Sequence, residues 1–325
     1  MAKEPISQED DIKREFNFAT HSIISQVLRG VLVGIFAGLV VGIFRFLIEK
    51  IFHLVQDVYH WSQQSMLWLL ALVLIYTFIV LLNTRLVKSE KNIKGSGIPQ
   101  VEAELKGLMS LSWWSVLWKK FVLGILAISS GLMLGREGPS IQLGAMSGKG
   151  VSKFLNLSAA EERALIASGA AAGLAAAFNA PIAGLLFVVE EVYRHFSRFF
   201  WVSTLAASLV ANFVSLSMFG LTPVLEMPDN IPVMKLEQYW IYLVMGLLLG
   251  LSGYIYEKVI LNIQQVYQFL GRLFRISEAY YPILAFALIL PIGYFLPHLL
   301  GGGNQLILSL TASHYTVGTL LLFFV

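Results

Sequence analysis

The sequence predicts an all-α polytopic membrane protein, and three observations support this fold class. Of its 325 residues, 57% are hydrophobic and only 13% are charged, whereas a soluble domain has roughly 25% charged residues. The mean hydropathy is +0.71. The apolar residues gather in long runs that recur along the chain. Such a chain cannot cover its surface with polar side chains, so lipid must be the solvent for much of its area.

The apolar runs and the breaks between them give the expected elements in order. Residues 1–20 are predicted to form a polar tail, and residues 21–325 one transmembrane domain. The longer helices are expected over 22–60, 65–87, 113–134, 199–218, 239–256 and 281–300. The shorter ones are expected over 101–109, 140–154, 164–178 and 182–191. A proline-containing loop is expected over 221–235.

The interruptions in these runs are as informative as the runs themselves. A straight helix needs about 20 apolar residues to cross the bilayer core, and several runs fall short of this or contain Gly or Pro. Segments of this kind predict broken helices that line a binding site. The stretch 164–178 is rich in Ala and Gly, which allows helices to approach closely in lipid.

Charge patterning orients the chain and excludes several classes of protein. The positive-inside rule places one basic loop on the cytoplasmic side, and this loop contains Arg85, Lys88, Lys91 and Lys94. A net charge of +3 without a basic stripe predicts no nucleic-acid partner. The chain has no cysteine, and its six histidines lack metal-ligand spacing, so we expect no metal site. No nucleophile–base pair or phosphate-binding loop stands out, so neither an enzyme nor a cofactor is expected. Glu102 and Lys120 fit an ion pair or a packing role, and we favour packing.

The segment Gly135-Arg136-Glu137-Gly138-Pro139 has the features of an anion site. A proline at the first helical position is a helix-start signal, and the N-terminus of a helix offers unpaired N–H groups and a positive dipole end. Glu137 precedes the predicted helix, so its carboxylate can take the place of an anion until it is protonated. The alternative is an ordinary helix cap, or an ion pair with Arg136. An ionisable residue inside a membrane segment favours the functional interpretation.

The segment Gly95-Ser96-Gly97-Ile98-Pro99 repeats this pattern. Flexible glycines surround a hydroxyl donor, Ser96, and a proline again marks a helix start. Taken alone, the segment fits a plain surface turn equally well. As a partner of the first segment, it indicates a second helix N-terminus at the same anion site.

A third motif, 178–184, contains a further proline helix start at Pro181 and is followed by Glu190 and Glu191. Adjacent carboxylates at the end of a helix usually form a solvated face. Here they end an apolar run, so one of them is a candidate inner port for protons on their way to Glu137.

The three motifs, in this order and spacing, resemble those of the CLC family of chloride channels and chloride/proton antiporters. The resemblance runs from about Gly30 to the last residue, and the combination of motifs is highly specific. It implies a CLC-type fold with broken and tilted helices, in a multi-pass protein of the cell membrane. It also implies chloride and protons as the transported ions, and a homodimer as the complete assembly.

The resemblance also implies roles for individual residues. Glu137 would be the external gate and proton carrier, and Ser96 the hydroxyl ligand of the central chloride. Glu191 would match the internal proton-transfer glutamate of the antiporters, a position that is commonly not acidic in the channels. The other anion-binding residues would be Gly97, Ile98, Arg136 and Gly138.

The sequence departs from the family pattern near its end. Family members carry a second, inverted half with a G-x-F-x-P motif and a tyrosine that completes the anion site, and neither is present here. The last residues also stop inside an apolar run, where a helix end would bury unpaired carbonyls. We therefore expect a CLC-type domain that is incomplete at its C-terminus and lacks most of the second inverted repeat.

The leading functional hypothesis is a secondary active chloride/proton antiporter, in which Glu137 alternates between blocking the anion site and carrying a proton. One alternative is a passive chloride channel, and Glu191 is the residue that discriminates between the two. The other alternative is a truncated remnant that does not transport on its own, which reconstitution of residues 1–325 would decide.

Overall fold

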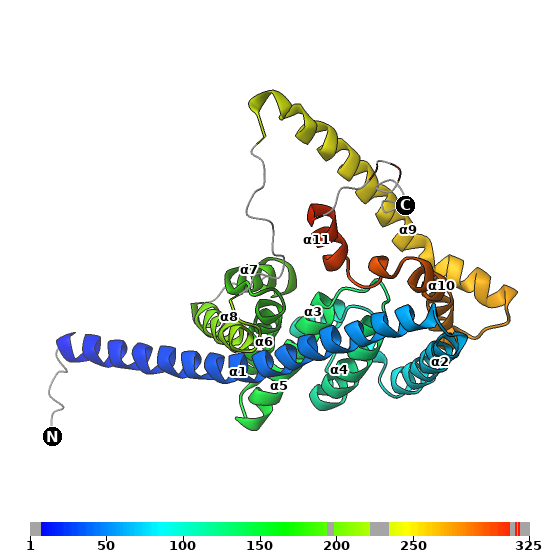
Figure 1. Cartoon of the computed structure of the whole chain (residues 1–325). Helices are drawn as coiled ribbons and strands as arrows, with labels where there is room; N and C mark the ends of the chain where they lie inside the picture. The colour runs from blue at the N-terminus through cyan, green and yellow to red at the C-terminus, as the bar shows by residue number, and fades with distance from the viewer. Residues whose placement is uncertain (1–7, 194–197, 222–233, 313–315, 317, 319–325) are drawn as a thin grey trace, which may run out of the picture.

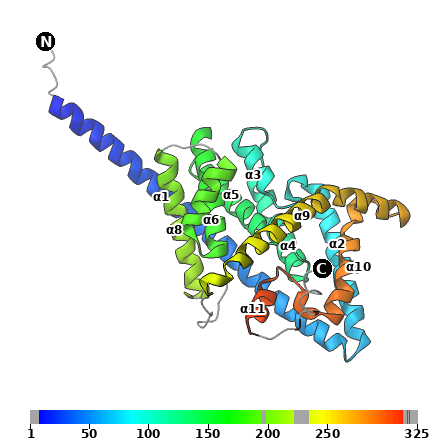
Figure 2. The same cartoon turned by 90° about the horizontal axis from the view of Figure 1, so that it is seen from above.

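The computed structural model describes residues 8–193, 198–221, 234–312, 316 and 318, and every regular element in these ranges is a helix. The longer helices are α1 (Gln8–Ser62), α2 (Met66–Ser89), α4 (Trp113–Ser129), α5 (Glu137–Phe154), α6 (Ala159–Phe178), α8 (Arg198–Phe219), α9 (Trp240–Leu273) and α10 (Pro282–Phe295). The shorter ones are α3 (Ile98–Leu105), α7 (Pro181–Phe187) and α11 (Asn304–Ala312). Both views show α1 extending beyond the other helices at its N-terminal end, and Figure 1 shows α9 reaching away from the bundle of α5, α6 and α8 (Figures 1 and 2).

The predicted all-helical membrane fold is confirmed, with differences at several boundaries. Residues 8–20, expected as a polar tail, are helical and continue into α1. Helix α5 begins at Glu137 rather than after Pro139, so the proline lies in its first turn. Helix α9 continues to Leu273, well beyond the expected end at 256. Most of the predicted loop at 221–235, and most of the C-terminal apolar run, lie outside the described residues.

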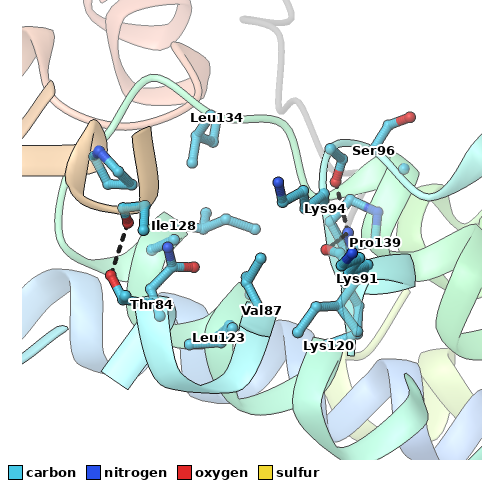
Figure 3. A pocket seen from close by; sticks show the side chains of 18 of the residues that line it. Thr84, Val87, Lys91, Lys94, Ser96, Lys120, Leu123, Ile128, Leu134 and Pro139 are labelled. Atoms are coloured by element: carbon cyan, nitrogen blue, oxygen red, sulfur yellow. Dashed lines mark hydrogen bonds between the residues drawn. The ribbon is translucent and has the colours of Figure 1, made fainter. Parts of the chain in front are cut away.

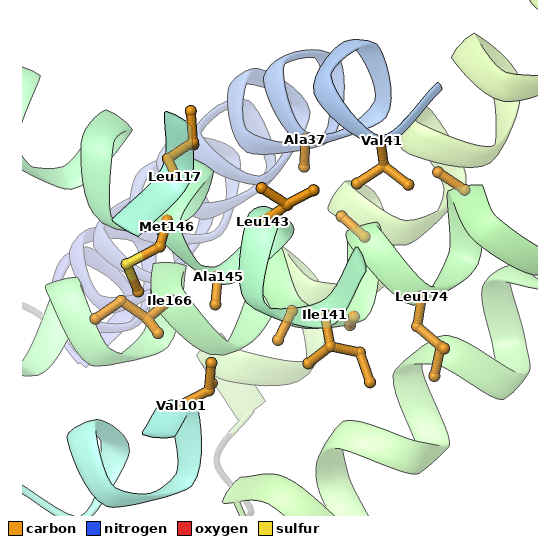
Figure 4. Close-up of a cluster of buried hydrophobic side chains, with 14 of the residues drawn as sticks. Ala37, Val41, Val101, Leu117, Ile141, Leu143, Ala145, Met146, Ile166 and Leu174 are labelled. Atoms are coloured by element: carbon orange, nitrogen blue, oxygen red, sulfur yellow. The ribbon is translucent and has the colours of Figure 1, made fainter. Parts of the chain in front are cut away.

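The centre of the fold is the close contact between α5 and α6. Gly144 of α5 lies against Gly169 and Gly173 of α6, and a Cβ atom on Gly144 would lie 2.9 Å from the Cα of Gly173. Only helices with small residues at the contact can approach so closely, in line with the Ala/Gly content of α6. Figure 4 shows buried apolar side chains of α1, α3, α4, α5 and α6 packed around this contact.

Helix α1 packs on α8 along a second row of small residues. The row has a glycine at every fourth position of α1, which keeps these residues on one face. A Cβ atom on Gly34 would lie 2.6 Å from the carbonyl oxygen of Ala207, and one on Gly38 would lie 2.9 Å from the Cα of Ala211. The row consists of Gly30, Gly34, Gly38 and Gly42.

Replacing Gly34 with alanine is expected to destabilise the fold, because the added methyl group has to push α8 away from α1. Overpacking of this kind costs about 1–3 kcal/mol. Thermal unfolding in detergent measures the effect. Gly246→Ala on α9 is the matched control, because no atom of the described part of the chain lies within 4 Å of a Cβ atom there. Equal unfolding temperatures for the two variants would contradict the proposed packing of α1 on α8.

Five helical stretches are long and apolar enough to cross a membrane: Ile23–Ser62, Met66–Ser89, Phe200–Phe219, Leu236–Leu273 and Glu278–Phe295. Large apolar side chains on these stretches are exposed, among them Leu74 (62%) and Phe213 (73%). Exposed apolar surface on this scale is compatible with lipid as the solvent. The chain is therefore a polytopic membrane protein. Helix α5, one of the two helices at its buried centre, has its N-terminus at the candidate site.

Candidate functional site

The first two motifs meet in space at the N-termini of α3 and α5. Gly97 caps α3 with φ +96°, a conformation that favours glycine, and Pro99 lies in the first turn. The Oγ of Ser96 accepts a hydrogen bond of 3.4 Å from the N–H of Ile98. Gly138, in the first turn of α5, lies against Ser96, and a Cβ atom on Gly138 would lie 2.7 Å from the Cβ of Ser96. The two helix N-termini, each with unpaired N–H groups, therefore converge.

A cavity of about 1050 Å³ opens at this meeting point. Ser96, Ile98, Glu137 and Gly138 of the predicted site line it. Figure 3 shows Lys91, Lys94, Ser96 and Lys120 gathered along one wall, with Ile128 and Leu134 on the other. A cavity with one apolar wall and a few convergent polar groups is the usual form of a small-ligand site.

The charges around this cavity favour an anion. Two glutamates, Glu137 and Glu278, line it, and they are outnumbered by its lysines, which are Lys88, Lys91, Lys94 and Lys120. Lysines in a concave, partly apolar site raise the local concentration of anions. Three of these lysines belong to or flank the basic loop that the sequence places on the cytoplasmic side, so we expect the cavity to face the cytoplasm.

Lys120 holds the loop that carries Ser96. It is only 4% exposed, and its Nζ donates hydrogen bonds of 3.1 Å to the carbonyl oxygen of Ile93 and 2.6 Å to that of Gly95. Gln142 of α5 supports the same loop from the other side, since its Nε2 donates to the carbonyl oxygen of Asn92 at 2.9 Å. The loop is thus attached to both α4 and α5.

Glu137 lies between this cavity and a second one of about 310 Å³, and it lines both. Its carboxylate folds back over Gly135, where a Cβ atom would collide with Oε2. Its side chain is half-buried at the first residue of α5, next to the positive end of the helix dipole. The two cavities are therefore adjacent, and their linings share Ile128, Leu134, Gly135 and Glu137.

The second cavity is lined by an ion-pair network that joins α1 to the start of α5. The Oε1 of Glu49 accepts a hydrogen bond of 3.0 Å from the Nε of Arg45 and one of 2.7 Å from the Nη1 of Arg136. The Arg136 side chain therefore turns toward α1, away from Ser96. Arg136 is the one member of this network that was predicted from the sequence as a site residue. The spacing of Arg45 and Glu49, which lie four residues apart on one helix face, is the sequence signal that could have predicted their ion pair.

The third motif lies apart from both cavities. Pro181 begins α7 as predicted, and α7 runs into a π-helical segment, Val188–Tyr193, that carries Glu190 and Glu191. Both glutamates are exposed, and neither lines either cavity. The segment packs against α3 and α6. The structure therefore places Ser96 and Glu137 at one cavity. Glu191 lies in a separate segment, which packs against α3.

Comparisons with known proteins agree with this architecture. The family model described as voltage gated chloride channel matches residues 77–325. An H(+)/Cl(-) exchange transporter, ClcA of Vibrio cholerae, is 34% identical and is matched over 97% of this chain and 68% of its own length. ClcA of Vibrio vulnificus is 36% identical over 71% of this chain and 50% of its own length. The chain thus spans about half the length of several curated relatives that it matches.

Solved structures show the same likeness. The crystal structure of a slow cyanobacterial Cl-/H+ antiporter matches 92% of this chain and 70% of its own chain, with a TM-score of 0.80 and 27% identity. The crystal structure of a CLC-type fluoride/proton antiporter shares the fold, with a TM-score of 0.69 and 21% identity over 98% of this chain and 75% of its own.

Proposed function

This chain belongs to the voltage gated chloride channel (CLC) family, and on that premise we propose that it exchanges chloride for protons across the cell membrane. The observation that carries the proposal is the position of Glu137. This one carboxylate lines two cavities, and it belongs to the first residue of α5, where the N-terminus of α5 meets that of α3. The ClcA relatives and the cyanobacterial antiporter are named for the same exchange.

The proposed anion site is formed by groups at the two N-termini. The Ser96 hydroxyl and the N–H groups of Gly97 and Gly138 supply hydrogen-bond donors without a full positive charge, and Arg136 contributes its backbone. The N–H of Ile98 joins them when it turns from the Oγ of Ser96 to the anion. Donors of this kind bind an anion while allowing it to leave, as conduction requires. The lysines of the larger cavity raise the anion concentration at its mouth.

In the proposed mechanism, Glu137 couples the two ions. Its ionised carboxylate competes with chloride for the positive end of α5, because both are anions at the same dipole. Protonation removes this competition, so a chloride can take the site while the carboxyl group carries a proton. Glu191 relays protons on the cytoplasmic side, from the π-helical segment that packs against α3. We also propose that the protein works as a homodimer in the membrane.

Flux through liposomes that contain residues 1–325 tests the proposal. Chloride movement is followed with a chloride electrode, and external pH is recorded at the same time. The expected result is proton movement in the direction opposite to chloride, at a fixed ratio. Chloride movement without proton movement would show a passive channel, and absence of chloride movement would contradict transport by this chain.

Replacing Glu191 with glutamine is expected to abolish proton coupling and leave chloride flux, because glutamine keeps the shape of the side chain but cannot carry a proton. The ratio of proton to chloride flux in liposomes measures the effect. Glu190→Gln is the matched control, since Glu190 is the neighbouring exposed carboxylate on the same segment. Coupling that survives in Glu191→Gln, or that is lost equally in both variants, would remove Glu191 from the proton route.

A further inference from the structure

A buried ion pair joins α3 to α5 beyond the cavities. The side chains of Glu104 and Lys149 are 5% and 3% exposed, and the Lys149 Nζ makes a short contact with Glu104 Oε1. The same ammonium group donates a hydrogen bond of 2.7 Å to the carbonyl oxygen of Leu111. Neither residue lines either cavity. Lys149 comes eleven residues after Gly138, which corresponds to roughly 16 Å along the helix axis.

The pair is the last of a series of contacts along one face of α5. Gly138, Gln142, Ala145 and Lys149 follow one another at intervals of four, three and four residues, the spacing of a single helix stripe. At the start of this stripe, Ser96 lies against Gly138, and a Cβ atom on Gly97 would lie 2.6 Å from the Cδ of Gln142.

At the other end of the stripe, Glu104 contacts Lys149. Between the two ends, Val101 of α3 is part of the same buried cluster as Ala145 (Figure 4). Because the contacts advance together along both helices, α3 and α5 run side by side in the same direction.

This arrangement needs a restraint against sliding. Two parallel helices bring their positive ends together, and like dipole ends repel. Each contact at the cavity end has a glycine on one side, Gly97 against Gln142 and Gly138 against Ser96, so side chains from both helices cannot interlock there. Lys149 counters the repulsion at the far end, because its charge lies close to the C-terminus of α3, where a cation is favourable.

The hydrogen bonding of the pair fits a positional role. Glu104 Oε1 accepts from Lys149 and, at 3.4 Å, from the N–H of Leu111, whereas Glu104 Oε2 is buried and has no hydrogen-bond partner among the described residues. A buried oxygen without a partner costs stability. A buried ion pair is weak support for stability in general, and its best-attested use is to select one register of two helices.

We propose that the Glu104–Lys149 pair fixes the register of α3 on α5, and that it thereby sets the position of Ser96 relative to Glu137. Both residues are positioning residues that act through their helices. The consequence for chloride rests on the proposed function, whereas the consequence for helix register does not.

The absence of native cysteine permits a direct measurement of this register. Spin labels are attached to Lys94→Cys, in the loop before α3, and to Phe154→Cys, at the exposed end of α5. Helix α5 has 18 residues and is roughly 27 Å long, a separation that pulsed electron resonance measures well. The distance between the labels reports where α3 begins along the α5 axis.

The test variant is the double replacement Glu104→Leu/Lys149→Met, whose apolar side chains of similar size are expected to fold. We expect its distance distribution to broaden or to shift by about 5 Å, one helical turn. Lys149→Arg keeps the charge and is expected to retain the distribution of the unaltered chain. Lys106→Met is the matched control, because it removes an exposed ion pair with Glu102 from the same end of α3.

Glu104→Gln is a second variant, in case the double replacement does not fold. It keeps the size of the side chain, removes its charge, and is expected to broaden the distribution. An unchanged distribution in whichever of these two variants folds would overturn the proposal. A change of the same size in Lys106→Met would overturn it as well.

Chloride titration calorimetry on the same variants, made without the two cysteine replacements and their labels, connects register to binding. The double variant is expected to bind chloride about tenfold more weakly than the unaltered chain, a difference of about 1.4 kcal/mol. If the unaltered chain binds no chloride while the label distances respond as expected, the proposed function fails and the register assignment stands. If chloride binds and the label distances do not respond, the register assignment alone fails.

Discussion

Glu137→Gln is expected to leave chloride flux in liposomes and to abolish the opposing proton flux. Glutamine has the size of the glutamate but carries neither its charge nor its proton. It therefore stops competing with chloride for the positive end of α5, and it cannot shuttle a proton between the two cavities that Glu137 lines. The measurement is simultaneous recording of chloride and external pH. We expect the proton-to-chloride ratio to fall below detection.

Glu278→Gln is the control for this variant. Glu278 lines the larger cavity only, so it tests whether any carboxylate in that cavity supports coupling. Coupling should survive in Glu278→Gln. If Glu137→Gln still exchanged protons at the original ratio, Glu137 would have no part in the mechanism, whatever its position between the cavities.

Lys120→Met is expected to weaken chloride binding at least tenfold and to lower stability. The replacement removes the only ammonium group seen to hold the carbonyl oxygens of Ile93 and Gly95 within the described residues. A buried carbonyl that loses its partner costs about 1–3 kcal/mol, and the loop that carries Ser96 loses its attachment to α4. Chloride titration calorimetry measures the first effect, and thermal unfolding in detergent measures the second.

The neighbouring lysine provides a matched control. Lys119 is also buried, but its Nζ donates to the Oγ of Ser115 at 2.9 Å, away from the Ser96 loop. Lys119→Met should therefore retain chloride binding. Equal weakening of binding in both variants would mean that burial of a lysine in α4 matters, rather than the contact with the loop.

The part of the site that depends on residues close together in the sequence could be predicted. Gly, Ser and Pro in two short segments indicated two helix starts with free N–H groups, and the structure brings Ser96 and Gly138 into contact there. The exact start of α5 was wrong for a local reason. A proline is tolerated anywhere in the first turn, since the N–H groups of that turn have no partner within the helix, so Pro139 did not mark the first helical residue.

The features that depend on distant residues could not be predicted. Lys120 resembled a packing residue, because carbonyl groups 25 and 27 residues away leave no pattern around it. The contact between Glu104 and Lys149 spans 45 residues. Helix α9 was predicted too short because the Glu257–Lys258 pair ends the apolar run there, and polar residues of good helix propensity continue a helix beyond the run.

On the proposed mechanism, the carboxylate of Glu137 is a competitor of chloride that is tethered to α5, and a tethered ligand has an effective concentration. For short flexible connections this concentration is on the order of millimolar. Free chloride must therefore reach a comparable concentration before it displaces the ionised side chain. On the proposed mechanism, the length of one glutamate side chain sets the range of chloride concentration over which the protein responds.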